Sequence, residues 1–269
     1  MATHRLFSSG ETQIEALVDG KGPLVILIAS LGRAAQDFDD LSRQLVAASY
    51  TTARPQPRGI GQSKGKMTGV SLNDLAGDVA AVIDGLGGVP AVLIGHAFGQ
   101  RVARMLSSIR PDLCRAVVML AAGGKVPVPA RARGALQACF DETLPADQHI
   151  EHVRYAFFAQ GNDPTVWADG WHRNVAEMQS AATTGLGRNE ATTSSATSVD
   201  AWWAGGTVKM LVVQGLQDTV AVPENGRLLK AEAGSRVELI EIDGAAHALL
   251  PERPNAVATH VLDFLKRLQ

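Results

Sequence analysis

A turn framed by two glycines is the segment of this chain whose residue types and spacing best suit chemistry. The run 90–106 has the pattern of an apolar strand, a sharp turn and a helix. Gly95 and Gly99 have the G-x-S-x-G spacing, in which the middle residue takes a strained backbone position and projects its side chain over the sheet edge. Phe98 would point its backbone N–H into the same place as an oxyanion donor. The middle residue here is Ala97, whose methyl group cannot attack a carbonyl.

The elements that must position this turn alternate along the chain. Short runs that are apolar on nearly every residue are typical of strands covered on both faces of a parallel sheet, and they lie at 24–30, 50–56, 90–96, 114–122, 208–215 and 237–243. Segments with helical periodicity lie at 36–48, 72–86, 99–109, 223–233 and 252–268. The N-terminal segment has the pattern of an antiparallel hairpin around Ser9-Gly10. The alternation predicts an α/β fold with a mostly parallel sheet of about eight strands and helices on both faces.

One long segment, from about 124 to 204, breaks this alternation and shows no strand pattern. Its helical segments lie near 130–139, 147–159 and 164–182, and the polar run 187–198 follows them. All four tryptophans of the chain lie in this segment, whereas disordered segments are poor in aromatic residues. We therefore predict a helical cap at 124–204, inserted into a core formed by 1–123 and 205–269.

Composition argues against several kinds of partner and cofactor. The chain has 269 residues, of which 46% are hydrophobic, enough for one large domain. A net charge of −2 gives no sign of a nucleic-acid or anionic-membrane partner. No run is long and apolar enough to span a bilayer, and the start lacks a signal-peptide pattern, so we expect a cytoplasmic protein. Two isolated cysteines and seven scattered histidines favour free thiols and no metal or other cofactor.

With these elements in place, the chain resembles the α/β-hydrolase superfamily over essentially its whole length. The third strand ends in Ala29-Ser30-Leu31, where that family often has a His-Gly pair, and residues 58–63 match its Arg-Gly-x-Gly-x-Ser turn. Residues 215–218 match the acid loop and residues 244–247 the histidine loop. The order elbow, acid, histidine is also the family's order.

The resemblance implies a catalytic triad whose nucleophile position is Ala97. It makes His247 the general base, which accepts a proton near pH 7 when its ring is held in the correct tautomer. Asp218 would hold that tautomer by accepting the other ring N–H. The backbone N–H groups of Leu31 and Phe98 would form the oxyanion hole.

Ala97 leaves several interpretations open. In the first, the chain has the machinery of a serine hydrolase for a small apolar ester, lactone or amide, inactivated by a Ser→Ala substitution. In the second, alanine is natural and Ser30 supplies another nucleophile, unless that hydroxyl only satisfies a backbone group. In the third, the His–Asp dyad works without hydrolysis, as in the cofactor-free oxygenases and lyases of this fold. The fourth is a ligand-binding pseudoenzyme.

The residues that would contact a small-molecule substrate lie after the third strand and in the cap. The candidates are Ser30, Arg33, Phe157, Phe158, Trp167 and Trp171. Arg33 could reach a carboxylate or ketone oxygen, or could simply be solvated. The aromatic rings either line the pocket or form the core of the cap. Arg101 and Arg104 are expected to be surface ion-pair partners, and a homodimer through the cap or the edge strand stays open.

Overall fold

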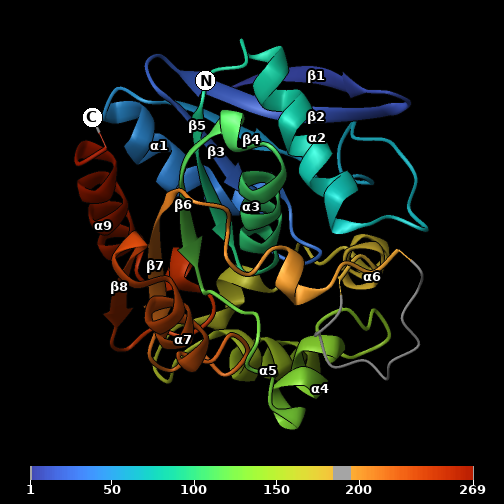
Figure 1. Ribbon diagram of the computed structural model, residues 1–269. Coiled ribbons are helices and arrows are strands. Elements are labelled where there is room, and N and C mark those ends of the chain that lie inside the picture. Colours follow the sequence, from blue (N-terminus) through green and yellow to red (C-terminus); the bar gives the residue numbers. More distant parts are fainter. Residues whose placement is uncertain (1, 184–194, 269) are drawn as a thin grey trace.

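A single mixed sheet organises the chain (Figure 1). The structure is a computed structural model that describes residues 2–183 and 195–268, so most of the polar run 187–198 lies outside the described residues. Within these residues, eight strands pair in the order β1-β2-β4-β3-β5-β6-β7-β8. The strands are β1 (Thr3–Ser9), β2 (Thr12–Gly20), β3 (Leu24–Ile28), β4 (Thr51–Pro55), β5 (Ala91–His96), β6 (Cys114–Leu120), β7 (Lys209–Gly215) and β8 (Val237–Ile242).

Strand direction divides the sheet into two parts. β1 and β2 form the antiparallel hairpin expected at the N-terminus, with Ser9 opposite Thr12, and β2 runs antiparallel to β4. From β4 through β8, every neighbouring pair is parallel. The carboxyl ends of these strands therefore meet at one edge, which is where the residues that follow β3, β5, β7 and β8 come together. The predicted fold class is confirmed.

Helices cover both faces of the sheet because the side chains of each strand alternate between two cores. Val25 and Leu27 of β3 pack toward α1 (Asp39–Ala47) and α9 (Pro254–Lys266). Ile26 of the same strand packs into the core on the other face. That face is covered by α2 (Leu72–Gly85), α3 (Phe98–Ile109) and α7 (Glu224–Ala233). Each fully buried aliphatic side chain stabilises the fold by roughly 1.5–3 kcal/mol, so both layers hold the carboxyl edge in place.

Residues 124–204, here called the cap segment, add no strand to the sheet within their described part. They form α4 (Ala130–Ala138), α5 (Ala146–Phe157) and α6 (Arg173–Ala181), with short 3-10 turns at Pro164–Trp167 and Val199–Ala201. The sequence predicts one helix over 164–182, and this is wrong: the backbone leaves the helix at 168–172. Gly170 there has φ +82°, a left-handed conformation that interrupts a right-handed helix. The boundary between cap and core stays a prediction.

The helices of the described residues also bear on membrane association. None of them combines the length and the apolar character that crossing a bilayer requires.

Candidate active site

Ala97 lies at the tip of a strained turn between β5 and α3. Its φ of 48° and ψ of −105° are unfavourable for a residue with a side chain, at a cost on the order of 1–3 kcal/mol. The two glycines make the turn feasible: a Cβ on Gly95 would overlap the backbone nitrogen of Gln100, and one on Gly99 would overlap the carbonyl oxygen of Ile28. The chain therefore keeps the backbone that presents a nucleophile while carrying a methyl group at that position.

His247 and Asp218 meet at the same edge of the sheet. β7 and β8 pair in parallel up to Gly215 opposite Ile242, so the loops after both strands start side by side. The Nδ1 of His247 lies 2.9 Å from Oδ2 and 3.1 Å from Oδ1 of Asp218. Because an ionised carboxylate only accepts, Nδ1 carries the proton and Nε2 is left with a lone pair. This arrangement can accept a proton from a bound molecule.

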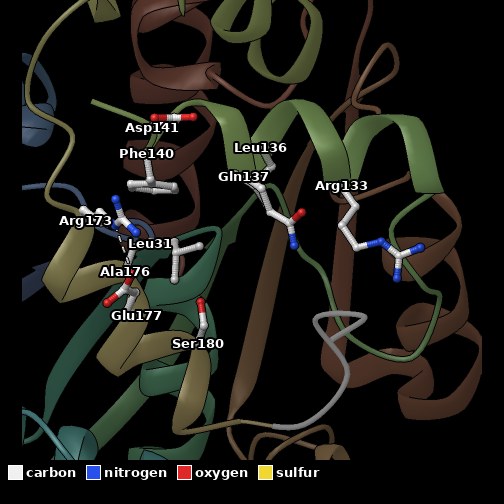
Figure 2. A pocket seen from close by; sticks show the side chains of 10 residues that line it. All are labelled: Leu31, Arg133, Leu136, Gln137, Phe140, Asp141, Arg173, Ala176, Glu177 and Ser180. Atoms are coloured by element: carbon white, nitrogen blue, oxygen red, sulfur yellow. Dashed lines mark hydrogen bonds and ion pairs between the residues drawn. The ribbon is translucent and has the colours of Figure 1, made fainter. Parts of the chain in front are cut away.

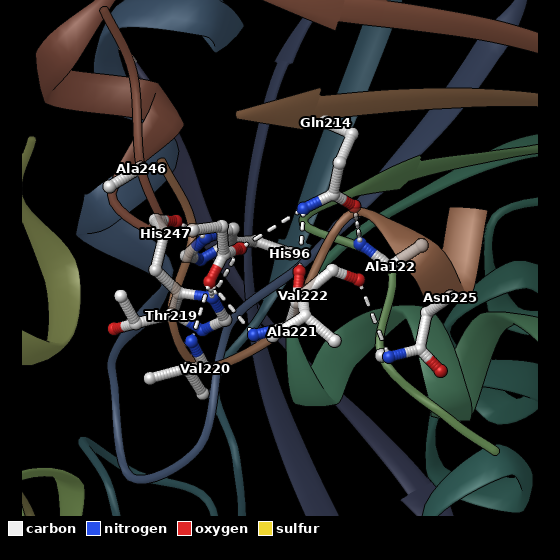
Figure 3. A network of polar contacts seen from close by, with 12 residues as sticks. His96, Ala122, Gln214, Thr219, Val220, Ala221, Val222, Asn225, Ala246 and His247 are labelled. Atoms are coloured by element: carbon white, nitrogen blue, oxygen red, sulfur yellow. Dashed lines mark hydrogen bonds and ion pairs between the residues drawn. The ribbon is translucent and has the colours of Figure 1, made fainter. Parts of the chain in front are cut away.

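Three further donors fix the carboxylate of Asp218; they come from Gln214, Val220 and Ala221, which are labelled in Figure 3. Its Oδ1 accepts from the backbone N–H groups of Val220 and Ala221, each at 2.8 Å. Its Oδ2 accepts from Nε2 of Gln214 at 3.2 Å. Gln214 is itself held, because its Oε1 accepts from the amide of Ala122 at 3.0 Å. Charge-assisted bonds of this kind fix the carboxylate that orients the imidazole.

Two buried residues that the sequence analysis did not assign a role hold the histidine loop. The Nε2 of His96 donates to the backbone carbonyl oxygen of His247 at 2.7 Å. Glu252 accepts from the amide of Ala246 at 2.7 Å and from the amide of Ala159 at 2.7 Å, so it ties the loop to the cap segment. Burial, together with the nearby His247 ring, lowers the pKa of His96 to about 3. His96 is therefore neutral near pH 7 and serves as a donor.

Ala97 and His247 line a narrow cavity, here called the inner cavity. Its volume is about 40 Å³, slightly more than the share of one water molecule in the liquid. Ser30, Leu31, Phe98 and Phe157 also line it. The register of β3 against β5, with Ile28 opposite Gly95, explains why the residues after these two strands share a cavity.

Two residues that line this cavity have backbone amides without an acceptor. Within the described residues, the amides of Leu31 and Phe98 donate to no group. The hydroxyl of Ser30 likewise makes no hydrogen bond there, although its backbone oxygen accepts from Arg33. Since unpaired buried donors carry a desolvation cost, the two amides are suited to receive an oxygen atom from a bound molecule.

A wider cavity, here called the outer cavity, lies between α4 and α6 (Figure 2). Its volume is about 310 Å³. Leu31 and Leu136 line both cavities, so these two side chains form the boundary between them. The exposed residues Gln137 and Arg173 line the outer cavity only, which places it on the solvent side.

Several predicted substrate contacts lie elsewhere. The guanidinium of Arg33 binds both carboxylate oxygens of Asp37, at 2.8 and 2.7 Å, and the backbone oxygen of Asp169 at 2.7 Å. It lies 4.6 Å from the ring centres of both Trp167 and Trp171. Neither Arg33 nor these rings line the inner cavity, and the same holds for Phe158. Of the four aromatic candidates, Phe157 lines it, while the others pack within the cap segment.

Arg101 and Arg104 are not surface residues, contrary to expectation. Arg101 is 6% exposed and Arg104 is fully buried. No carboxylate of the described residues lies within ion-pair distance of either guanidinium. Trp202 and Trp203, where the cap segment returns to the sheet, cover this part of α3 and remove it from solvent. Arg101 lines the inner cavity together with Ala97.

The sequence is similar to a hydrolase family and to two known hydrolases. A family model described as serine aminopeptidase, S33, matches residues 21–254. Epoxide hydrolase B of Mycobacterium tuberculosis is 29% identical over 157 residues, which are 55% of this chain and 42% of that protein. The 2-(acetamidomethylene)succinate hydrolase of Mesorhizobium japonicum is 32% identical over 111 residues, 41% of this chain and 40% of that protein. Both matched segments span less than half of these relatives.

A solved structure agrees over nearly the full chain. The esterase of Exiguobacterium antarcticum superposes with a TM-score of 0.79 at 16% identity, covering 99% of this chain and 100% of that chain. At this identity the likeness concerns the fold. Among the described residues, no group of three or more metal-ligating side chains is present.

Proposed function

Because the chain belongs to the serine aminopeptidase S33 family and has the α/β-hydrolase fold, we propose that it hydrolyses small esters or lactones, or amides, through water activated by His247. The observation that carries the proposal is the His247–Asp218 pair, intact and buried opposite a turn that carries a methyl group. The dyad can activate a nucleophile, and Ala97 supplies none. Water is the nucleophile that fits the space available in the inner cavity.

The proposed reaction follows the positions of these groups. The Nε2 of His247 takes a proton from water, and the water oxygen adds to the carbonyl carbon of the substrate. The carbonyl oxygen becomes an oxyanion and accepts from the amides of Leu31 and Phe98. When the carbon–oxygen or carbon–nitrogen bond to the leaving group breaks, the imidazolium returns the proton to that group. The products are an acid and an alcohol or amine, with no covalent adduct on the protein.

Hydrolysis rates on a panel of aryl esters and small lactones test this proposal. His247→Gln removes the base and is expected to lower kcat by about 10²–10⁴, the range for general-base catalysis. His260→Gln, on α9 and outside the site, is the matched control and keeps the wild-type rate. Equal rates for His247→Gln and wild type would overturn the proposal. So would an acyl group found on Ser30 by mass spectrometry after rapid quenching, because that would make Ser30 the nucleophile.

A second candidate uses the same dyad without hydrolysis. The methyl group of Ala97 favours this candidate, because removing a proton from a C–H or O–H group of a bound molecule needs a base and no nucleophilic side chain. In that case a bound molecule exchanges hydrogen for solvent deuterium in a His247-dependent way while its ester bonds stay intact. Ester cleavage without such exchange would exclude this candidate.

A further inference from the structure

Arg101 is a charged side chain in the inner cavity that the proposed reaction does not use. It lies on the first turn of α3, four residues after Ala97. Its guanidinium lies near Thr183, Trp202 and Gly123. Arg101 and Ala97 line the same cavity.

Among the described residues, the guanidinium of Arg101 has little to balance its charge. Its Nη1 donates a long hydrogen bond of 3.4 Å to the uncharged hydroxyl of Thr183, and its Cζ lies 5.2 Å from the ring centre of Trp202. No described carboxylate lies within ion-pair distance. Burial lowers the pKa of Arg101 to about 10, so it remains protonated near pH 7. A buried cation without a counter-ion is costly, which sets this residue apart from the paired arginines of the fold.

The surroundings of Arg101 add further donors and no anion. Arg104 is fully buried beside it, and its Nη1 and Nη2 donate to the backbone oxygens of Trp203 and Gly123 at 3.1 and 2.7 Å. The Nε of Arg104 and the indole Nε1 of Trp202 are buried and have no acceptor among the described residues. Two guanidinium groups and an excess of donors therefore give this end of the inner cavity a positive potential.

Arg33, a second buried arginine near the site, shows how an arginine with a purely structural role is held in this fold. Arg33 is buried to a similar degree, yet both its charge and its donors are taken up by Asp37 and Asp169. Within residues 2–183 and 195–268, Arg101 has neither a carboxylate nor a backbone oxygen as partner, and it lines the cavity. Since His247, the proposed base, lines the same cavity, a ligand bound there can supply the counter-ion that the described residues do not.

We infer that Arg101 binds a carboxylate of the substrate, so the molecules turned over are short acids whose scissile carbonyl lies a few bonds from a free carboxylate. This rests on the proposed function for the scissile group. Ala97 and Arg101 line the same narrow cavity, so a carbonyl bound beside Ala97 and a carboxylate bound by Arg101 would belong to one short molecule, such as a succinate half-ester. The oxyanion amides would receive the ester carbonyl, and Arg101 the acid.

Equilibrium binding tests the inference without any turnover. Acetate and butyrate are titrated against acetamide and butyramide, which have nearly the same size and no charge, at constant ionic strength. For the wild type, the two acids are expected to raise Tm and change tryptophan fluorescence, because Trp202 lies against Arg101, while the amides leave both unchanged. Arg101→Met is expected to weaken acid binding at least about tenfold, the loss of one charged hydrogen bond. Arg131→Met, an exposed arginine on α4, is the matched control and binds as the wild type.

The same variants separate a ligand-binding role from a structural one. In buffer without carboxylates, Arg101→Met is expected to have a Tm equal to or above that of the wild type, since it removes an unbalanced buried charge. A lower Tm with unchanged acid binding would overturn the inference. If Arg101→Met does not fold, the wild type alone decides: equal effects of acids and amides would overturn the inference.

Kinetics then separate the inference from the proposed function. The wild type is expected to hydrolyse monomethyl succinate with a higher kcat/KM than dimethyl succinate, and Arg101→Met to lose that preference at least about tenfold. Acid binding without turnover of either ester would leave the inference standing and overturn the proposed function. Turnover of neutral esters with no binding of acids would leave the proposed function standing and overturn the inference about Arg101.

Discussion

The Nε2 of His96 donates to the backbone carbonyl oxygen of His247 across 2.7 Å, so the residue before the turn holds the loop that carries the base. The two rings also contact each other, with centres 5.4 Å apart. The position of the base therefore depends on the end of β5 as well as on Asp218. This coupling explains how the strand that presents Ala97 and the loop after β8 keep a fixed relation.

Replacing Ala97 by serine is expected to install a covalent route. The backbone at this position already has the strained geometry, and the dyad stands ready to activate a hydroxyl. Because losing a triad nucleophile costs up to about 10⁶-fold in kcat, we expect Ala97→Ser to raise the rate on aryl esters at least about 10²-fold. A fluorophosphonate should label residue 97 in this variant alone. Ala97→Gly is the control and gains nothing; equal rates for both variants would contradict the prediction.

Asp218→Asn is expected to lower kcat by about 10²–10⁴. An amide in place of the carboxylate can donate to Nδ1 of His247, which leaves the proton on Nε2, the atom that must accept. Asp243→Asn, on the exposed loop after β8, is the control. Circular dichroism checks that both variants fold. A folded Asp218→Asn protein with wild-type activity would mean that this carboxylate does not orient the base.

Acid is expected to destabilise the fold through His96. The folded-state pKa of about 3 lies below the ordinary value of 6.5, so between these values the unfolded chain binds a proton and the folded chain does not. Stability from this group is complete above pH 6.5 and falls as the pH drops toward 3, with a slope of up to about 1.4 kcal/mol per pH unit. Urea unfolding at pH 7, 6 and 5 measures it. His96→Asn should flatten the profile, while His260→Gln should not; identical profiles for wild type and His96→Asn would refute the assignment.

Trp167→Ala is expected to lower the free energy of unfolding by about 3–5 kcal/mol, the usual cost of truncating a buried aromatic ring. The ring is 4% exposed and packs against Arg33 and Phe157. Its neighbour Val166 is 58% exposed, so Val166→Ala is the matched control and should change stability little. Urea denaturation measures both. A stable Trp167→Ala variant with weakened ligand binding would return this ring to the pocket wall, where the sequence analysis had also considered it.

The sheet could be predicted from the sequence because each of its strands, and each helix that covers it, has a recognisable local residue pattern. Runs such as 24–30 are apolar on nearly every residue, and the loops after β7 and β8 follow directly from where those runs end. The pairing of Asp218 with His247 then follows from parallel neighbours that end together. These features need only local periodicity and the rule that parallel strands share a carboxyl edge.

Features that depend on the cap segment could not be predicted in this way. Arg101 and Arg104 have the spacing of a solvated helix face, and only the return of Trp202 and Trp203 over α3 buries them. Arg33 is taken up by a backbone oxygen from residue 169, far along the chain. Gln214 was within reach of sequence reasoning, because a glutamine inside an otherwise apolar strand signals a buried polar contact.

The boundary formed by Leu31 and Leu136 has a consequence for inhibition. A compound that fits the outer cavity, of about 310 Å³, but is too wide to pass between Leu31 and Leu136 would stop against these two side chains. It would compete with substrate while touching neither His247 nor Arg101. Selective inhibitors of this protein would then be chosen by their width and by their fit to α4 and α6. They would not need to resemble the substrate or the transition state.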